Sequence, residues 1–234
     1  MTQYLYLILD ISVLLMIIPL SFDKKVSYVS TWKSAFLSVV LVGVPFLVWD
    51  VLFTEWSIWG FNDSYLSGIY LYNLPIEEVL FFIVVPFACT FIYACAKAYF
   101  SHLTLVRFNI YTNLFILVYS IYLIIAGWGN YYSMSAGILS ILLLLLDCYL
   151  KGNFKYFPLA FMVSLVPFLI MNGILTGATT PEPIVWYNED HIIGWRYFTI
   201  PIEDVIYSFS LLFMNVALYE YFNKRFGIQF PEQD

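Results

Sequence analysis

Charged residues are scarce in this chain: Asp, Glu, Lys and Arg make up only 11% of its 234 residues, against roughly 25% in soluble domains. Hydrophobic residues make up 62% and aromatic residues 21%, which predicts an integral membrane protein surrounded by lipid. The ten Lys and Arg are outnumbered by sixteen Asp and Glu. The chain therefore lacks a basic surface for phosphates, and we expect no nucleic acid partner.

Cysteine and histidine are also rare, and their positions exclude the common metal and disulfide motifs. Cys89, Cys95 and Cys148 form no Cys-x-x-Cys pair and lie in apolar runs, so we expect small core residues rather than zinc ligands. His102 and His191 are too few and too far apart in the sequence to indicate a metal cluster. We expect no metal site.

A glycine-rich nucleotide fingerprint is absent too. The nearest approach to Gly-x-Gly-x-x-Gly is residues 127–132, which read Gly-Trp-Gly-Asn-Tyr-Tyr and lack the third glycine. This stretch links two apolar segments rather than a strand and a helix, as the fingerprint requires. The sequence therefore predicts no nucleotide cofactor.

Apolar segments, in contrast, fill most of the chain. A helix that crosses a bilayer needs about 20 mostly apolar residues, and the hydropathy predicts seven such segments: 4–22, 34–53, 75–96, 105–126, 134–150, 157–175 and 201–222. The first segment lacks a basic leader and contains Asp10, which favours a retained helix over a cleaved signal peptide. We expect an all-α integral membrane protein with seven transmembrane helices.

The distribution of Lys and Arg predicts the orientation of these helices, because cations in short loops stay in the cytoplasm. The loops after the second and fourth segments contain no cation, and the loop after the sixth contains only Arg196. The other nine cations belong to the opposite face: Lys24, Lys25, Lys33, Lys97, Arg107, Lys151, Lys155, Lys224 and Arg225. We expect a multi-pass protein of the plasma membrane with its N-terminus outside and its C-terminus in the cytoplasm.

The sequence also contains an internal repeat. Residues 45–54 match residues 167–176 position by position, and the block Pro-Ile-Glu-Glu at 75–78 returns 126 residues later as Pro-Ile-Glu-Asp. Trp59 and Trp186 correspond within one residue of slip. Four crossings separate equivalent points, so the two units run in the same direction and are related by a pseudo-two-fold axis along the membrane normal.

This repeat predicts a 3+1+3 arrangement of helices. Residues 1–100 form the first three-helix repeat and residues 131–234 form the second, with a short cytoplasmic tail. Residues 101–130 supply the linking helix between them. Under this division both Pro-Ile-Glu blocks begin a helix at the same depth, near the outer interface.

The acidic residues of these blocks are the strongest candidates for function. Proline followed by acids is an ordinary helix start, but ionisable residues inside a membrane usually face a cavity. Successive helical positions differ by about 100°, so at most one acid of each pair faces a shared cavity squarely. Asp50 of the second helix and Asn172 of the sixth occupy equivalent positions of the repeat. The predicted centre therefore consists of Glu77, Glu78, Glu203, Asp204, Asp50 and Asn172.

Aromatic residues surround this predicted centre, and an aromatic belt at the headgroup level is the alternative explanation for most of them. Phe81 and Phe82 each follow an acid by four residues, which places a ring one turn below the acid on the same helical face. Such an arrangement suits the protonation of an apolar molecule and the shelter of the resulting cation. The residues expected to bind substrate are Trp49, Trp59, Phe81, Phe82, Asn172, Trp186 and Tyr207.

These motifs resemble the small integral-membrane lycopene cyclases. The duplicated Pro-Ile-Glu-[Glu/Asp] block carries most of the resemblance, together with Trp49-Asp50 and the Trp-Gly-Phe-Asn stretch at 59–62. The resemblance spans nearly the whole chain and is to the fused, single-chain form. One departure is that the Trp-Asp pair of the first half is Met171-Asn172 in the second, which puts equal roles for the two halves in doubt.

The resemblance implies a lycopene β-cyclase that converts lycopene through γ-carotene to β-carotene. It implies catalysis by the motif acids Glu77, Glu78, Glu203 and Asp204. The implied reaction is a non-redox isomerisation, classed as an intramolecular lyase, that needs an acid, a base and a dry pocket but no cofactor. The implied partners are lycopene and its carotenoid intermediates.

Two alternatives come from other classes of membrane protein. A small-solute transporter can have the same 3+1+3 plan with acidic gates, but it needs a polar path where the inner halves of the third and seventh segments are apolar. A retinal photoreceptor needs a Schiff-base lysine, which residues 201–222 lack. The sequence leaves open which acid is donor or base, the number of sites and rings, a C40 or C50 substrate, and homo-oligomer formation.

Overall fold

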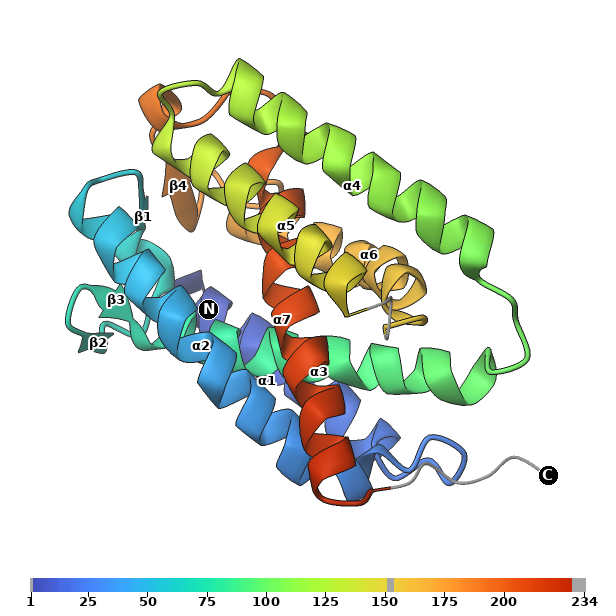
Figure 1. The fold of residues 1–234 in the computed structure, drawn as a ribbon. Helices are drawn as coiled ribbons and strands as arrows, with labels where there is room; N and C mark the ends of the chain where they lie inside the picture. Colours follow the sequence, from blue (N-terminus) through green and yellow to red (C-terminus); the bar gives the residue numbers. More distant parts are fainter. Residues whose placement is uncertain (1, 151–153, 229–234) are drawn as a thin grey trace.

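The protein is described by a computed structural model that covers residues 2–150 and 154–228. Within these residues it forms seven α-helices (Figure 1): α1 (Leu5–Leu20), α2 (Trp32–Glu55), α3 (Ile76–Tyr99), α4 (Val106–Ala126), α5 (Tyr131–Tyr149), α6 (Phe157–Leu175) and α7 (Glu203–Arg225). Six of them are long and apolar enough to cross a membrane, and α1 is a shorter apolar helix of 16 residues. The predicted all-α membrane fold is confirmed.

The helix boundaries differ from the predicted segments at two informative places. Helix α5 begins at Tyr131 and has 19 residues, so it is longer than the hydropathy indicated. Helix α7 begins at Glu203 because Pro201 belongs to a short strand that precedes the helix. The acids of α3 and α7 both lie in a first turn, where they interact favourably with the positive end of the helix dipole.

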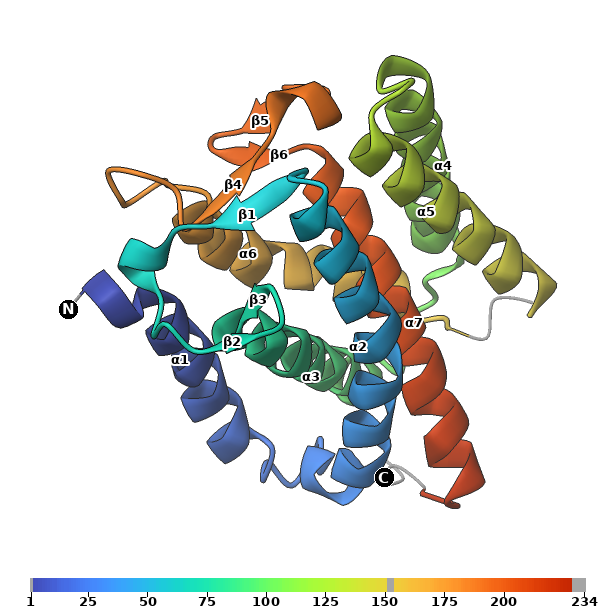
Figure 2. The same cartoon turned by 90° about the vertical axis from the view of Figure 1, so that its left-hand side faces the viewer.

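In the described part of the chain, six short strands that the sequence did not predict lie near the amino ends of α3 and α7 (Figure 2). They are β1 (Trp59–Phe61), β2 (Tyr70–Leu71), β3 (Leu74–Pro75), β4 (Val185–Tyr187), β5 (Arg196–Tyr197) and β6 (Ile200–Pro201). Strands β2 and β3 form a hairpin that leads into α3, and β5 and β6 form a hairpin that leads into α7. Each hairpin thereby fixes where the following helix begins.

The two hairpins repeat each other in backbone detail. Gly68 and Gly194 have φ of 81° and 84°, and the tip residues Tyr72 and Phe198 have φ of 61° and 56°. A positive φ is uncommon for a bulky side chain, so its occurrence at both tips identifies the same turn built twice. The interval is the 126 residues that separate the Pro-Ile-Glu blocks.

Strands β1 and β4 pair across the pseudo-two-fold axis. Their antiparallel register sets Gly60 opposite Trp186 and Trp59 opposite Tyr187. A Cβ on Gly60 would lie 2.3 Å from the Trp186 ring, so only glycine permits this close approach. At the 126-residue interval Trp186 corresponds to Gly60, which explains the slip of one residue between the two tryptophans in the sequence repeat.

The helices form two equivalent groups of three. In the first group α1 and α6 pack on α3, and in the second α5 and α2 pack on α7. Helix α4 lies outside this arrangement and packs along α5 (Figures 1 and 2). The 3+1+3 plan therefore exchanges helices between the halves, since α6 of the second repeat contacts α3 of the first.

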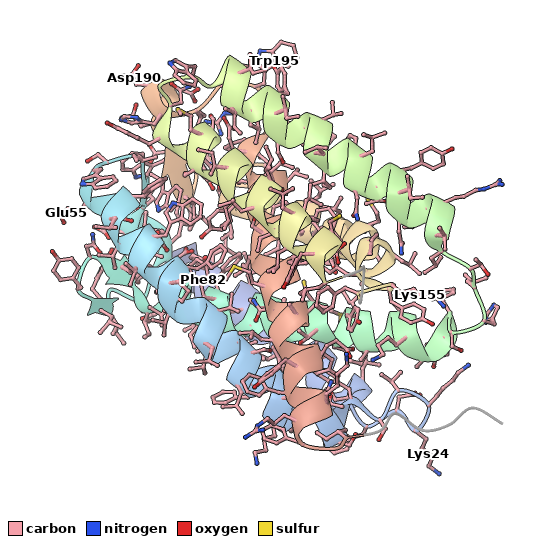
Figure 3. The ribbon with its side chains drawn as sticks, in the orientation of Figure 1. Lys24, Glu55, Phe82, Lys155, Asp190 and Trp195 are labelled. Atoms are coloured by element: carbon pink, nitrogen blue, oxygen red, sulfur yellow. The ribbon has the colours of Figure 1, made fainter. Side chains whose placement is uncertain are left out.

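Cationic side chains gather at the end of the bundle away from the strands. Figure 3 shows Lys24 and Lys155 at this end, with Asp190 and Trp195 at the other. Lys151 lies outside the described residues. Lys97 of α3 pairs with Glu220 of α7 at 2.6 Å in the same region. This segregation agrees with loops that alternate between the two sides of a membrane.

The cationic half of the bundle has an aromatic core. Phe157 and Phe161 of α6 pack edge-to-face against Phe209 of α7, with ring centroids 5.5 and 5.4 Å apart, and Phe213 joins them. Of the three cysteines, Cys89 is buried and Cys95 is partly buried, but Cys148 is exposed. The expectation that all three are core residues was wrong for Cys148, which lies on the outer face of α5.

Candidate active site

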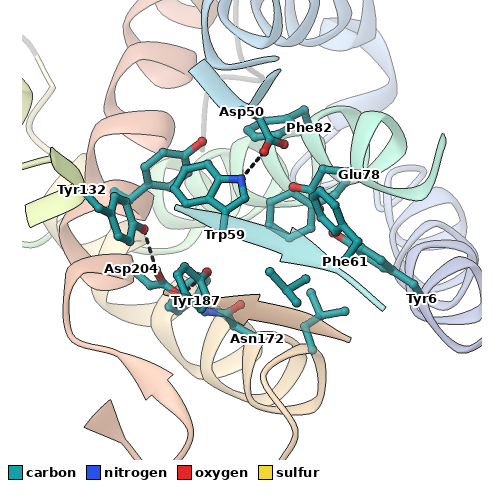
Figure 4. Close-up of a pocket in the computed structure, with 15 residues that line it drawn as sticks. Tyr6, Asp50, Trp59, Phe61, Glu78, Phe82, Tyr132, Asn172, Tyr187 and Asp204 are labelled. Carbon is teal, nitrogen blue, oxygen red and sulfur yellow. Dashed lines mark hydrogen bonds between the residues drawn. The ribbon is translucent and has the colours of Figure 1, made fainter. Parts of the chain in front are cut away.

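A cavity of about 60 Å³ lies between the two halves, beneath the β1–β4 pair (Figure 4). Three carboxylic acids and one amide line it, namely Asp50, Glu78, Asp204 and Asn172, and all four are buried. The remaining wall is aromatic and aliphatic: Tyr6, Trp59, Phe61, Phe81, Phe82, Tyr132, Phe168, Leu175, Val185, Tyr187 and Tyr207. The cavity thus combines several ionisable groups with apolar walls.

The first half contributes a pair of carboxyl groups. Tyr6 of α1 donates a hydrogen bond of 2.7 Å to Glu78 Oε2, and the Trp59 indole donates one of 2.5 Å to Asp50 Oδ1. Glu78 and Asp50 lie close enough for their charges to repel, and Asp50 Oδ2 has no partner among the described residues. Two carboxyl groups buried side by side cost less free energy when they share a proton than when both are charged.

The second half contributes one carboxyl group with three donors. Asp204 accepts hydrogen bonds from Tyr132 at 2.5 Å, from Asn172 Nδ2 at 2.7 Å and from Tyr187 at 3.0 Å. Burial, followed by the charge of Asp204, raises the pKa of Tyr187 well above its ordinary value, so this phenol keeps its proton and remains a donor. Donors directed at a carboxylate stabilise its ionised form.

These two arrangements share a scaffold but differ, besides the acids themselves, at three equivalent pairs of residues: Asp50 and Asn172, Trp59 and Val185, and Phe61 and Tyr187. Tyr6 and Tyr132 are 126 residues apart, and each donates to the second acid of its Pro-Ile-Glu block. Asp50 and Asn172 occupy equivalent positions of the sequence repeat. The first is a carboxyl that adds a possible charge beside Glu78, whereas the second is an amide that donates to Asp204.

The first acid of each block has a different environment. Glu77 Oε1 accepts the backbone N–H of Ser67 at 2.7 Å, and Glu203 Oε1 accepts that of Ile193 at 2.7 Å. Ser133 also donates to Glu203 Oε1. Both glutamates are fully buried and neither lines the cavity. Their observed contacts hold the loop before the hairpin against the helix.

Of the residues expected to bind substrate, five line the cavity and two do not. Trp59, Phe81, Phe82, Asn172 and Tyr207 line the cavity. Trp49 does not, because it packs between Phe46 and Tyr207 on the side away from the acids. Trp186 is 39% exposed and covers Gly60 on the outer surface of the strand pair.

Several residues of the site were missed by sequence reasoning. Tyr6 and Tyr132 could have been found, because the interval of the Pro-Ile-Glu repeat also relates these two tyrosines. Phe168 gave no such signal, since it is one apolar residue among many in its helix. Asp10 does not line the cavity, but it is fully buried near Glu77 and neither of its oxygens has a hydrogen-bond partner among the described residues.

The described residues contain no group of three or more His, Cys, Asp or Glu placed to hold a metal ion. What the geometry offers is proton transfer. A pair of carboxyl groups and a third carboxyl with three hydrogen-bond donors line the same aromatic cavity, which suits acid and base steps on an apolar molecule.

Comparison with known proteins gives an independent indication of the family. The model of the lycopene cyclase family matches residues 3–96 and 128–222, one stretch on each side of α4. A bifunctional lycopene cyclase/phytoene synthase from Leptosphaeria maculans is 29% identical over 77 residues, which cover 33% of this chain and 13% of the fungal protein. No solved structure matches the chain. Because the family model covers most of both repeats, the chain belongs to the lycopene cyclase family.

Proposed function

We propose that this protein is a lycopene β-cyclase, which closes the acyclic ψ ends of lycopene to β rings through γ-carotene to β-carotene. The single observation that carries the proposal is the buried set of Asp50, Glu78 and Asp204 around one aromatic cavity. Family membership supports carotenoid cyclisation. The bifunctional fungal relative is named a lycopene cyclase/phytoene synthase.

The Asp50–Glu78 pair acts as the acid in this proposal. Because one proton shared by two buried carboxyl groups avoids adjacent negative charges, the pair keeps a proton available near neutral pH. The Tyr6 and Trp59 hydrogen bonds hold the two carboxyl groups in place. The pair transfers this proton to C2 of the end group and is left as a carboxylate.

Asp204 acts as the ionised partner. Its three donors favour the carboxylate and leave free about one of the roughly four lone-pair positions of a carboxylate. The charge of Asp204 stabilises the carbocation across the cavity. Asp204 then accepts the proton that leaves C6.

The reaction balances without an oxidant or reductant. Protonation at C2 uses the electrons of the C1–C2 double bond and leaves a cation at C1. The C5–C6 double bond attacks C1, which forms the ring bond between C1 and C6 and moves the cation to C5. Loss of the C6 proton to Asp204 restores a C5–C6 double bond, and return of that proton to the Asp50–Glu78 pair completes the cycle.

The aromatic walls protect the cation from water. Phe82 is buried in the cavity wall, and Trp59 and Tyr207 also line it. The faces of such rings attract a cation without offering a nucleophile. Water that reached the cation would add to it, so the dry aromatic lining favours cyclisation over hydration.

In this proposal Glu77 and Glu203 are positioning residues, because each accepts a hydrogen bond from loop backbone instead of facing the cavity. The protein lies in the plasma membrane with its strand-bearing end outside and its cationic end in the cytoplasm, as the distribution of Lys and Arg favours. A transporter would need a polar path through the cationic half, where Phe157, Phe161 and Phe209 are packed together.

The test is to express the chain in a bacterium engineered to accumulate lycopene and to identify the pigments by chromatography. The proposal predicts γ-carotene and β-carotene in place of lycopene. Unchanged lycopene in cells whose membranes contain the folded protein would contradict it. A product with a different ring would be consistent with membership of the lycopene cyclase family but would contradict the proposed β-cyclase activity.

A further inference from the structure

The acidic cavity continues into a second, apolar cavity of about 100 Å³. The two cavities share Phe81, Phe168, Asn172 and Tyr207 in their walls. We name the second cavity the α1/α6 groove, and its wall includes Val13, Met16, Val85, Ala88, Pro167 and Met171. Met16 is 53% exposed and Pro167 is also exposed, so the groove reaches the lipid-facing surface of the bundle.

The pseudo-two-fold axis relates this groove to another one on the opposite side. The α2/α5 groove is lined by Pro45, Phe46, Trp49, Leu139 and Met214, among others. These positions correspond in the repeat to Pro167, Phe168, Met171, Val13 and Ala88. Among the described residues, however, the α2/α5 groove shares none of its lining with the acidic cavity.

A cluster of three aromatic rings separates the α2/α5 groove from the acids. Trp49 stacks on Phe46 with ring centroids 5.8 Å apart, and Tyr207 meets both rings edge-on at 5.2 Å. On the other side of the axis Met171 replaces Trp49, and the space that the indole fills remains part of the cavity.

The other differences between the grooves act in the same direction. Ala88 stands where the α2/α5 groove has Met214, and Val13 stands where it has Leu139. At each of the three positions the smaller side chain lies in the groove that reaches the acids. The asymmetry is therefore distributed over α1, α3 and α6 and does not depend on one side-chain conformation.

We propose that the α1/α6 groove binds the polyene chain of the substrate while one end group lies against Glu78, and that the α2/α5 groove does not admit substrate. This inference rests on the proposed function and adds the path of the hydrocarbon to it. A linear polyene has no polar group, and the wall of the groove matches it, since apart from Ser164 and Ser208 its polar residues are those shared with the acidic cavity, Asn172 and Tyr207. One groove and one cavity accommodate one end group at a time.

This arrangement has a consequence for the order of products. After the first ring forms, the molecule must leave the groove and return with its other end before a second ring can form. A monocyclic carotene should therefore appear first, be released into the membrane and compete with lycopene for the same groove.

A matched pair of variants tests the inference. Ala88→Phe fills the α1/α6 groove, and Met214→Phe adds bulk at the equivalent position of the α2/α5 groove. We expect Ala88→Phe to lower the initial rate of lycopene consumption at least about tenfold and Met214→Phe to change it less than about twofold. Both rates are normalised to the amount of folded protein in the membrane.

Equal losses in the two variants, or a larger loss in Met214→Phe, would overturn the inference. If Ala88→Phe does not accumulate in the membrane, Val13→Phe against Leu139→Phe provides the same comparison with the same expected and contradicting outcomes. Failure of the wild type to cyclise lycopene would instead reject the proposed function. An active wild type with a fully active Ala88→Phe variant rejects the groove alone.

Discussion

The two halves of the site differ at several equivalent positions, and the pair Asp50 and Asn172 is the decisive one in the proposed mechanism. In the first half a carboxyl group, Asp50, stands beside Glu78, and in the second half an amide, Asn172, donates to Asp204. Tyr6 and Tyr132, the two hairpins and the loop hydrogen bonds are repeated, whereas Tyr187 has Phe61 as its counterpart. The comparison teaches that a two-fold scaffold can give equivalent acids different neighbours, and the proposed mechanism assigns them opposite protonation states on this basis: a carboxyl beside Glu78, and amide and phenol donors beside Asp204.

The largest effect is expected for Glu78→Gln, which removes one of the two carboxyl groups of the proposed proton-holding pair and leaves Asp50 alone. Loss of general acid catalysis typically costs about 10²–10⁴-fold, and we expect a rate loss of this order with normal protein levels. Initial rates of lycopene consumption in membranes measure it. A variant that kept more than about a third of the wild-type rate would remove Glu78 from the mechanism.

Exchange of the decisive residue gives the next largest effect. Asn172→Asp adds a carboxyl beside Asp204 and removes a donor at 2.7 Å, so the second half would also hold a proton and lose its stable anion. We expect about a tenfold or greater loss of rate. The matched change Asp50→Asn should also impair the enzyme, and the double variant should not recover activity unless the halves are interchangeable, which would contradict the assigned roles.

A smaller effect on the rate is expected for substitution of the two equivalent tyrosines, Tyr6 and Tyr132. Tyr132 donates to the proposed anion Asp204, whereas Tyr6 donates to a carboxyl of the proton-holding pair. Hydrogen bonds to charged groups contribute about 1.5–3 kcal/mol, and those between neutral groups contribute about 0.5–1.5 kcal/mol. Tyr132→Phe should therefore lower the rate more than Tyr6→Phe, and the reverse order in a side-by-side rate assay would exchange the roles of the two halves.

The smallest effect on turnover is expected for Glu77→Gln. Glutamine retains the oxygen that accepts the Ser67 N–H, and the substitution leaves the carboxyl groups that line the cavity unchanged. We therefore expect activity within about threefold of wild type. The motif resemblance implies a catalytic Glu77 instead. A loss as large as that of Glu78→Gln would support that implication and contradict a positioning role.

The sequence predicted the helices well because long apolar runs leave a clear signal. It could not predict β1 or β2, since strands of two or three residues have no periodic pattern. The sequence placed Glu77 and Glu78 together at the start of a helix. It could not predict which of the two faces the cavity, because that depends on the rotation of α3 against α1 and α6. Trp49 and Trp186 are aromatic residues of the kind that often bind apolar substrates. Only the tertiary packing determines that both lie outside the acidic cavity.

The most direct test of proton transfer by buried carboxyl groups is deuterium incorporation. Protein equilibrated in heavy water is given lycopene under single-turnover conditions, and the cyclic product is analysed by mass spectrometry. The account predicts one deuterium for each ring formed, located at C2, because the transferred proton comes from an exchangeable carboxyl group. A ring that forms without deuterium would contradict it.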